Sequence, residues 1–299
     1  MQLSGVYVPL ITPFDANGQV ALPALEALTR HVLDEGASGI VVFGTTGEPA
    51  SLSLAEQQSV LDVVSGVCRE RSRPLIVGAN TVQVAQTFAR RAEVSAALAL
   101  VPPFLRPGEN GVVAHFEALA AASPVPLIVY HVPYRTGQPL SANALRRIAA
   151  IDNIIGIKYA VGGIDAGTVD FLADLPSGLA VLGGDDPFIS PLLALGAHGG
   201  ILASAHLATA AFAALAEAWR AGDVGRARAL GHRLAPLSSA LFAEPNPTVI
   251  KAVLHAQGRI PTPDVRLPLL PAAPASHDAA LRCLAAVAQT EARRGSLVG

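Results

Sequence analysis

One lysine lies inside a run of strand-forming residues, where its amine could act as a nucleophile. Lys158 belongs to the stretch Ile154–Ala160 (IIGIKYA), in which apolar residues do not alternate with polar ones. Such a stretch is typical of a strand buried on both faces in a parallel sheet. Burial disfavours the ammonium form and lowers the pKa of a lysine, and the neutral amine forms Schiff bases with carbonyl compounds. The alternative is a lysine whose ammonium reaches solvent or an ion pair at the strand end.

Two threonines between glycines follow another apolar stretch and could bind an anion. The sequence Gly44–Glu48 (GTTGE) comes directly after Gly39–Phe43 and supplies backbone N–H groups and the hydroxyls of Thr45 and Thr46. This combination suits a carboxylate or a phosphate. The alternative is an ordinary turn between a strand and a helix, because short glycine-containing turns are weak indicators of function.

A tyrosine and an arginine follow a third apolar stretch. Tyr130 ends Pro126–Tyr130 (PLIVY) and could act as a general acid or base beside a lysine, or bond to backbone at the rim of the fold. Arg135 could hold a carboxylate through two parallel hydrogen bonds, or form a surface ion pair.

Two adjacent aspartates are the strongest candidate for a metal site. Asp185 and Asp186 follow Gly184, and no third ligand lies near them in the sequence. We therefore expect them to cap the following helix, and we predict no metal site. The isolated histidines His131 and His206 are expected to be structural.

Eight apolar stretches, each followed by a segment with helical spacing, would position these side chains. Helical spacing or capping residues lie between consecutive stretches, as in Leu22–Glu35 and Ser53–Arg71. This alternation predicts an α/β fold, a (β/α)8 TIM barrel; the even spacing favours it over a doubly wound open sheet. The predicted strands are Gly5–Ile11, Gly39–Phe43, Pro74–Gly78, Ala96–Val101, Pro126–Tyr130, Ile154–Ala160, Leu179–Leu182 and Gly200–Ala203.

A barrel of this kind gathers its functional residues at the C-terminal ends of the strands. On the eighth strand, Ile201 would contribute its backbone carbonyl to the pocket rather than its side chain. The residues that this rule brings together are Thr45, Thr46, Tyr130, Arg135, Lys158, Gly184 and Ile201.

After the eighth strand the pattern becomes helical. The segments Val224–Phe242, Thr248–Gln257 and Asp278–Arg293 have helical spacing, and a proline-rich connector lies between the last two. We predict a barrel over residues 1–222 and a C-terminal α-helical extension over 223–299.

The composition excludes several classes of protein. The formal net charge is −2, and no run of Lys and Arg stands out, which argues against nucleic acid or an anionic membrane as partner. No uninterrupted apolar run is long enough to cross a bilayer, and the N-terminus does not resemble a secretory signal. The cysteines Cys68 and Cys283 lack the spacing of metal ligands, so we expect reduced thiols and a cytoplasmic protein.

Taken together, these segments resemble the dihydrodipicolinate synthase/N-acetylneuraminate lyase family of class I, Schiff-base lyases, and most closely its dihydrodipicolinate synthase branch. The resemblance runs over nearly the whole chain and includes Asn246-Pro247 between two C-terminal helices. The motifs that carry it are Gly44–Glu48, the segment 130–137 (YHVPYRTG), Gly156-Ile157-Lys158 and Gly184-Asp185-Asp186.

The resemblance implies a role for each catalytic residue. Lys158 would form an imine with pyruvate or another 2-oxo acid, and Tyr130 would shuttle protons. Thr45 and Thr46 would bind the carboxylate, and Thr46 would also relay protons to Tyr130. Such a mechanism needs no metal or organic cofactor, because the lysine itself carries the substrate.

The remaining matches concern the two substrates. Gly184 and Ile201 would line the pyruvate pocket, and Arg135 would receive the carboxylate of a second, aldehyde substrate. The arginine favours the synthase branch over the sialic acid lyases. The family usually forms dimers of dimers, so we expect a homo-oligomer, a dimer or a tetramer.

Two departures from the family pattern stand out. Where a tyrosine of typical synthases reaches into a neighbouring subunit and completes a proton relay, this chain has Phe104, which cannot carry a proton. Leu54, Val84 and Pro103 stand where polar or aromatic contacts to inhibitory lysine are expected. The resemblance therefore predicts an enzyme insensitive to lysine.

Three hypotheses of function follow. The first is a Schiff-base lyase of the 4-hydroxy-tetrahydrodipicolinate synthase type, which joins or cleaves pyruvate and an aldehyde. The second is a catabolic aldolase or dehydratase of sugar-acid or hydroxyproline pathways that uses the same lysine. The third is a non-catalytic small-molecule sensor or partner-binding barrel that kept the pocket, since a fold and a pocket do not fix function.

Overall fold

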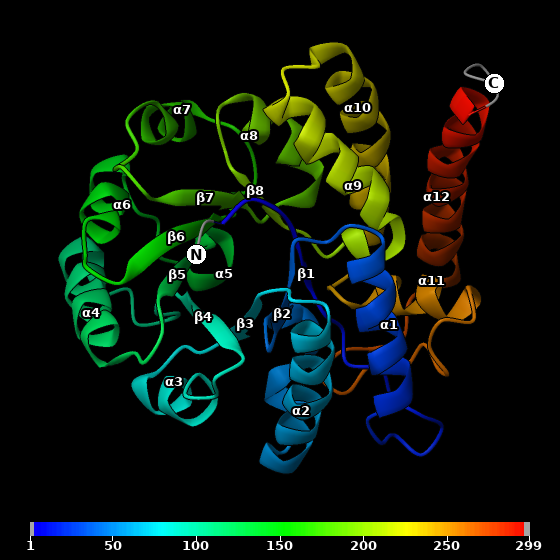
Figure 1. The fold of residues 1–299 in the computed structure, drawn as a ribbon, viewed down its shortest axis with the longest axis horizontal. Coiled ribbons are helices and arrows are strands. Elements are labelled where there is room, and N and C mark those ends of the chain that lie inside the picture. Colours follow the sequence, from blue (N-terminus) through cyan, green and yellow to red (C-terminus); the bar gives the residue numbers. More distant parts are fainter. Residues whose placement is uncertain (1–2, 296–299) are drawn as a thin grey trace.

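The centre of the protein is a closed barrel of parallel strands; the structure, a computed structural model, describes residues 3–295. Each strand pairs with its neighbours in sequence, and β8 pairs with β1 where Gly199 lies opposite Gly5 (Figure 1). The predicted (β/α)8 barrel is thereby confirmed over an open sheet. The strands are β1 (Gly5–Pro9), β2 (Gly39–Val42), β3 (Leu75–Gly78), β4 (Val94–Leu100), β5 (Leu127–His131), β6 (Ile154–Tyr159), β7 (Ala180–Gly183) and β8 (Gly199–Ile201).

Closure of the barrel depends on a glycine at the β1–β8 seam. A Cβ atom added to Gly199 would lie 1.9 Å from the carbonyl oxygen of Gly5, so no other residue fits without moving the strands.

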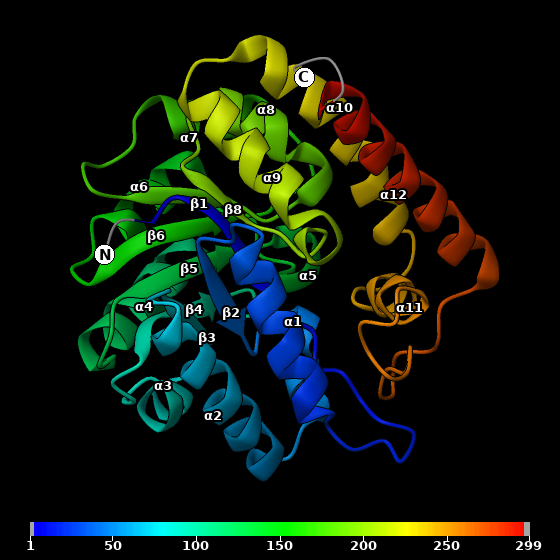
Figure 2. The ribbon, with the colours of Figure 1, turned by 45° about the vertical axis from the view of Figure 1, so that its right-hand side comes forward.

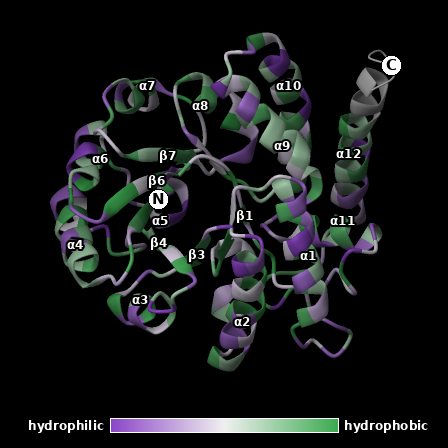
Figure 3. Ribbon diagram, in the orientation of Figure 1, coloured by the Kyte–Doolittle hydropathy of each residue, from purple (hydrophilic) through white to green (hydrophobic). Residues whose placement is uncertain are grey.

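An outer layer of helices surrounds the barrel and carries both hydrophobic and hydrophilic residues, as amphipathic helices do (Figures 1 and 3). Helix α2 begins with a capping box formed by Ser53 and Glu56. Helix α3 is short, because β4 begins at Val94 and the chain has to turn before it. The helices between strands are α1 (Leu22–Asp34), α2 (Leu54–Glu70), α3 (Val82–Phe88), α4 (Gly108–Ala122), α6 (Ala142–Ala149), α7 (Ala166–Ala173), α8 (Ile189–Ala194) and, after β8, α9 (Ala205–Arg220).

The C-terminal segment is helical, as predicted, and packs against one side of the barrel (Figures 1 and 2). It consists of α10 (Val224–Leu241), α11 (Thr248–Ala256) and α12 (Pro274–Gly295), with α10 packed between α9 and α12. Its buried apolar side chains, such as Leu237 and Ile250, belong to the same hydrophobic cluster as the outer face of the barrel. No helix among residues 3–295 is long and apolar enough to span a membrane.

Inside the barrel a smaller hydrophobic cluster fills the space below the strand ends. It is formed by side chains that point inward from the strands, which is why residues two apart on a strand share it. Its buried members are Leu3, Tyr7, Val41, Ile76, Ala96, Leu98, Ile128, Tyr130, Val132, Ala160, Ala180, Leu182 and Ile201.

Candidate active site

Lys158 and Tyr130 lie side by side at the C-terminal ends of β6 and β5. The strand register pairs Tyr130 directly with Lys158, so both side chains point into the barrel. The Nζ atom of Lys158 lies 4.2 Å from the centre of the Tyr130 ring, over its face. Only 6% of Lys158 is exposed, although the residue carries an amine. The strand is buried on both faces, as the sequence predicted.

Burial shifts the pKa of both Lys158 and Tyr130. Desolvation lowers the pKa of Lys158 to about 8, against an opposite effect of the Asp186 carboxylate. Desolvation raises the pKa of Tyr130 to about 12, so the phenol keeps its proton at neutral pH. The pair therefore combines an amine that can be neutral with a hydroxyl that can donate and accept a proton.

The loop Gly44–Glu48, here called the threonine loop, follows β2 and faces Lys158 and Tyr130. Residues Thr45–Gly47 form a single 3₁₀ turn, in which Thr46 is buried and Thr45 is exposed. The Nδ2 atom of Asn246 donates a hydrogen bond of 2.8 Å to Oγ1 of Thr46. A residue of the C-terminal segment therefore contacts one of the two predicted carboxylate-binding hydroxyls.

The last residue of this loop is fixed by a buried ion pair. Glu48 adopts a left-handed backbone conformation (φ 53°), and its Oε1 accepts a hydrogen bond of 2.6 Å from Nζ of Lys251 on α11. Lys251 is fully buried, and its ammonium also lies 4.0 Å from the centre of the Phe14 ring. The second oxygen of Glu48 accepts from the backbone N–H of Arg266 at 2.8 Å. These contacts hold the threonine loop against the C-terminal segment.

Arg135 reaches the same crevice from a short helix that the sequence did not predict. Helix α5 (Pro133–Thr136) directly follows β5, and Arg135 on it is exposed to solvent. Its guanidinium lies 5.9 Å from the ring of Tyr134, and no carboxylate among the described residues pairs with it. The guanidinium at the mouth of the crevice is available to an anion.

Gly184 keeps the lysine side chain in place by having no side chain of its own. A Cβ atom at this position would lie 2.7 Å from Cε and 3.1 Å from Cγ of Lys158. A larger residue here would displace the lysine side chain, so glycine at this position leaves room for the observed conformation of Lys158. One narrow crevice is lined by all the predicted site residues, namely Thr45, Thr46, Tyr130, Arg135, Lys158, Gly184 and Ile201.

The expectation that Asp185 and Asp186 cap the following helix is wrong. No side-chain cap is present there. Asp185 instead accepts hydrogen bonds from the hydroxyl of Tyr134 (3.0 Å) and the backbone N–H of Gly162 (2.6 Å). Asp186 accepts from the backbone N–H of Ser204 at 2.6 Å. The two carboxylates bind neighbouring loops together at the strand ends, a long-range use that local spacing does not reveal.

The two histidines are neutral structural groups. Burial lowers the pKa of both His131 and His206 to about 4. His206 accepts from the backbone N–H of Ile11 at 3.1 Å through Nε2, and its Nδ1 lies 2.7 Å from the carbonyl oxygen of Ala203. No cluster of His, Cys, Asp and Glu within residues 3–295 has the arrangement of a metal site.

Asp186 and Asn246 line the crevice, although sequence reasoning did not predict them as site residues. Asp186 is 2% exposed and shares the crevice with Lys158, and desolvation raises the pKa of its carboxyl to about 6. Asn246 lies between α10 and α11 and reaches back to Thr46. The Asn246-Pro247 dipeptide was visible in the sequence, but no local pattern places it over the barrel.

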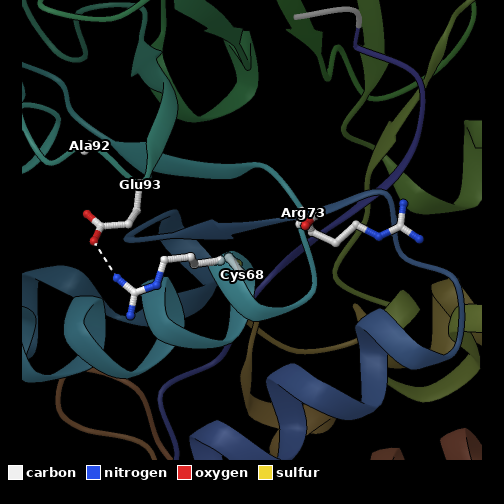
Figure 4. Close-up of a pocket in the computed structure, with 6 residues that line it drawn as sticks. Cys68, Arg73, Ala92 and Glu93 are labelled. Carbon is white, nitrogen blue, oxygen red and sulfur yellow. Dashed lines mark hydrogen bonds and ion pairs between the residues drawn. The ribbon is translucent and has the colours of Figure 1, made fainter.

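A larger hollow lies at the opposite end of the barrel, beside the starts of β3 and β4 (Figure 4). Its volume is about 380 Å³, against about 20 Å³ for the crevice at Lys158. An ion pair between Arg69 and Glu93 spans it at 3.2 Å. Burial raises the pKa of the Cys68 thiol to about 12, so the hollow offers no nucleophile at neutral pH. Its lining residues are Cys68, Arg69, Ser72, Arg73, Ala92 and Glu93.

Known proteins resemble this chain in both sequence and fold. A sequence model of the Dihydrodipicolinate synthetase family matches residues 2–287. The 4-hydroxy-tetrahydrodipicolinate synthase of Syntrophus aciditrophicus is 38% identical over 270 residues, which covers 89% of this chain and 91% of that protein.

Two solved structures extend the likeness to three dimensions. The 4-hydroxy-tetrahydrodipicolinate synthase from Methylacidiphilum fumariolicum SolV has a TM-score of 0.90 at 30% identity and covers 99% of both chains. The dihydrodipicolinate synthase from Acinetobacter baumannii, solved in complex with pyruvate, has a TM-score of 0.89 at 33% identity and covers 96% of this chain and 99% of that one. The predicted family and the predicted class of Schiff-base lyase are confirmed, and this chain belongs to the dihydrodipicolinate synthetase family.

Proposed function

We propose that the protein joins pyruvate to an amino-aldehyde through an imine on Lys158, as an enzyme of the 4-hydroxy-tetrahydrodipicolinate synthase type. The observation that carries this proposal is the buried amine of Lys158, with its Nζ 4.2 Å from the centre of the Tyr130 ring. Support comes also from the relatives, which bear that enzyme name, and from the pyruvate bound by the Acinetobacter baumannii protein.

The first half of the reaction would convert pyruvate into a carbon nucleophile. The neutral amine of Lys158 attacks the keto carbon, and the oxygen leaves as water after Tyr130 has delivered a proton to it. The hydroxyls of Thr45 and Thr46 hold the pyruvate carboxylate by donating hydrogen bonds. The imine then withdraws electrons from the adjacent methyl group, which loses a proton and becomes an enamine.

The second half would form the carbon–carbon bond. The enamine carbon attacks the aldehyde carbon, and the aldehyde oxygen takes up a proton. Arg135, whose guanidinium has no carboxylate partner among the described residues, would hold the carboxylate of the aldehyde substrate through two parallel hydrogen bonds. Water then hydrolyses the product imine and restores the free lysine.

Trapping of the imine tests this proposal directly. The protein is mixed with pyruvate and borohydride, which reduces an imine to a stable amine. We expect the mass of one reduced pyruvyl group on Lys158 and none in Lys158→Ala. An unmodified protein, or an adduct on another lysine, would reject the proposal.

A second candidate function follows from Phe104. Its side chain is 86% exposed and does not line the crevice of its own chain. The resemblance places a proton-carrying tyrosine at this position, and a phenyl ring cannot carry a proton. A catabolic aldolase or dehydratase acting on 2-oxo sugar acids or hydroxyproline-derived acids would use the same lysine. Turnover of pyruvate with aspartate semialdehyde, and none with 3-deoxy-2-oxo sugar acids, would eliminate this candidate.

We further propose that the enzyme needs no metal or organic cofactor, works in the cytoplasm as a homo-oligomer, and is insensitive to lysine. The insensitivity is inferred from Leu54, which is 57% exposed, together with Val84 and Pro103. Apolar side chains at these positions offer no hydrogen bonds to an amino acid. Addition of millimolar lysine should leave the initial rate unchanged, whereas inhibition would refute this part.

A further inference from the structure

The hydrogen bond between Asn246 and Thr46 directs the proton of the threonine hydroxyl away from Asn246. A hydroxyl has one proton to donate and can also accept. Because Oγ1 of Thr46 accepts from Nδ2 of Asn246 at 2.8 Å, the hydroxyl proton remains for a different partner. Thr46 is 3% exposed, and both residues line the crevice that contains Lys158.

The other end of the Asn246 amide supports a role beyond packing. Its Oδ1 atom is buried and has no hydrogen-bond partner among the described residues. Buried polar atoms without partners are uncommon in proteins, and each calls for an explanation. The unpaired Oδ1 is explained if the amide is held in the orientation that places Nδ2, rather than Oδ1, against the hydroxyl of Thr46.

The segment that carries Asn246 is firmly attached to the threonine loop. The next helix, α11, supplies Lys251, which pairs with Glu48 at 2.6 Å inside the protein. Thr46 and Glu48 of one loop thus each contact a residue of the same C-terminal segment. Asn246 is therefore held where its amide can act on the hydroxyl.

We propose that Asn246 is a positioning residue that makes Thr46 a hydrogen-bond donor toward the carboxylate of the bound 2-oxo acid. This inference rests on the proposed function, in which Thr46 binds that carboxylate. An ionised carboxylate only accepts hydrogen bonds, so the hydroxyl has to present its proton to it. By donating an N–H to one lone pair of the hydroxyl oxygen, Asn246 turns the Thr46 proton away from itself, so that the proton can be presented to the carboxylate.

Asn246→Asp separates this role from simple packing, because it keeps the shape of the side chain and replaces the N–H donor by an acceptor. The carboxylate would draw the Thr46 proton to itself and repel the substrate carboxylate. We expect the KM for pyruvate to rise by about 10-fold to 100-fold, the range that hydrogen bonds to charged groups support. Asn246→Ala, which removes the neutral amide without adding a charge, should raise KM by about 2-fold to 10-fold.

Two further readouts distinguish positioning from a structural contribution. Lowering the pH protonates an aspartate at position 246, whose hydroxyl could then donate to Thr46, so the ratio of the variant's kcat/KM to that of the wild type should recover. In the background of Thr46→Val, adding Asn246→Ala should change KM by less than about 2-fold, because residues that act through one another are not additive. The thermal midpoints of all variants are measured alongside, and Asn17→Asp, in an exposed turn, controls for the added charge.

The outcomes separate this inference from the proposed function. A wild-type KM in Asn246→Asp, or full additivity with Thr46→Val, would overturn the positioning role while imine trapping on Lys158 still succeeds. Failure of the wild-type protein to trap pyruvate would instead reject the proposed function.

Discussion

Burial turns the amine of Lys158 into a nucleophile at physiological pH. At its ordinary pKa of 10.5 about one lysine in 3,000 is neutral at pH 7, whereas at a pKa of about 8 the fraction is about one in ten. The cause is desolvation among the inward-facing side chains of the barrel, opposed by the nearby Asp186 carboxylate. The local environment thus makes the neutral amine several hundred times more abundant.

The pH dependence of imine formation tests this account. The rate of borohydride trapping with pyruvate should rise with pH and reach half of its plateau near pH 8, because the neutral form reacts. The charged or titratable groups around Lys158 are Tyr130, Arg135, Asp185 and Asp186. Since the Asp186 carboxylate stabilises the ammonium form, Asp186→Asn should move the midpoint to lower pH.

The control for this series is Asp174→Asn, whose side chain is 88% exposed and should leave the midpoint unchanged. A wild-type midpoint near 10.5, or a shift to higher pH in Asp186→Asn, would contradict the electrostatic account.

A methyl group at position 184 should disable the lysine without unfolding the protein. The Cβ of Gly184→Ala would lie 2.7 Å from Cε of Lys158, so the flexible amine chain has to move away from Tyr130. We expect kcat to fall at least about 100-fold, the loss that misplacement by about 1 Å can cause. Gly163→Ala is the matched control, because its added Cβ meets no atom within 4 Å. Equal kcat values for the two variants would show that the close approach of Gly184 to Lys158 does not affect catalysis.

At the scale of elements, the strands could be predicted from sequence and the interactions between distant loops could not. The runs of Val, Ile and Leu that end at Tyr130 and Lys158 specify strands, and the barrel rule then places both residues at one end. Helix α5 is too short to carry a periodic pattern. Asn246 and Asp186 contact partners far away in sequence, and no spacing in one chain encodes such contacts.

Replacing one partner of the buried ion pair between Glu48 and Lys251 should destabilise the protein more than replacing both partners. Lys251→Met would leave the Glu48 carboxylate buried without its counter-charge, so we expect the free energy of unfolding to fall by about 3–5 kcal/mol. Glu48→Gln together with Lys251→Met should regain part of that loss, because no unpaired charge remains. Urea unfolding of the single and double variants measures the coupling.

A surface pair gives the comparison for this experiment. Arg220 and Glu217 also form an ion pair, but their side chains are 72% and 52% exposed, so Glu217→Ala should cost at most about 1 kcal/mol. If the double variant at the buried pair were as unstable as the sum of its singles, the unpaired charge would not be the cause.

At the scale of the whole molecule, the barrel and the C-terminal segment share one hydrophobic cluster, yet part of the apolar surface remains outside it. The loop between β4 and α4 carries Phe104 and Leu105, which are 86% and 82% exposed. Phe104 also adopts a left-handed backbone conformation (φ 68°), which is uncommon for a bulky residue. Neighbouring exposed apolar side chains of this kind are typical of surfaces that contact another protein.

We therefore expect the proposed homo-oligomer to bury this loop. Light scattering coupled to size-exclusion chromatography should give at least twice the mass of the chain, and Phe104→Glu with Leu105→Glu should give a single chain. Burying two carboxylates in an apolar contact costs several kcal/mol each, enough to dissociate most interfaces. The connector after α11 carries Leu267 and Leu270, which are 78% and 67% exposed, so Leu267→Glu with Leu270→Glu is the matched control. If the control dissociated the oligomer and the loop variant did not, the connector rather than the loop would form the contact.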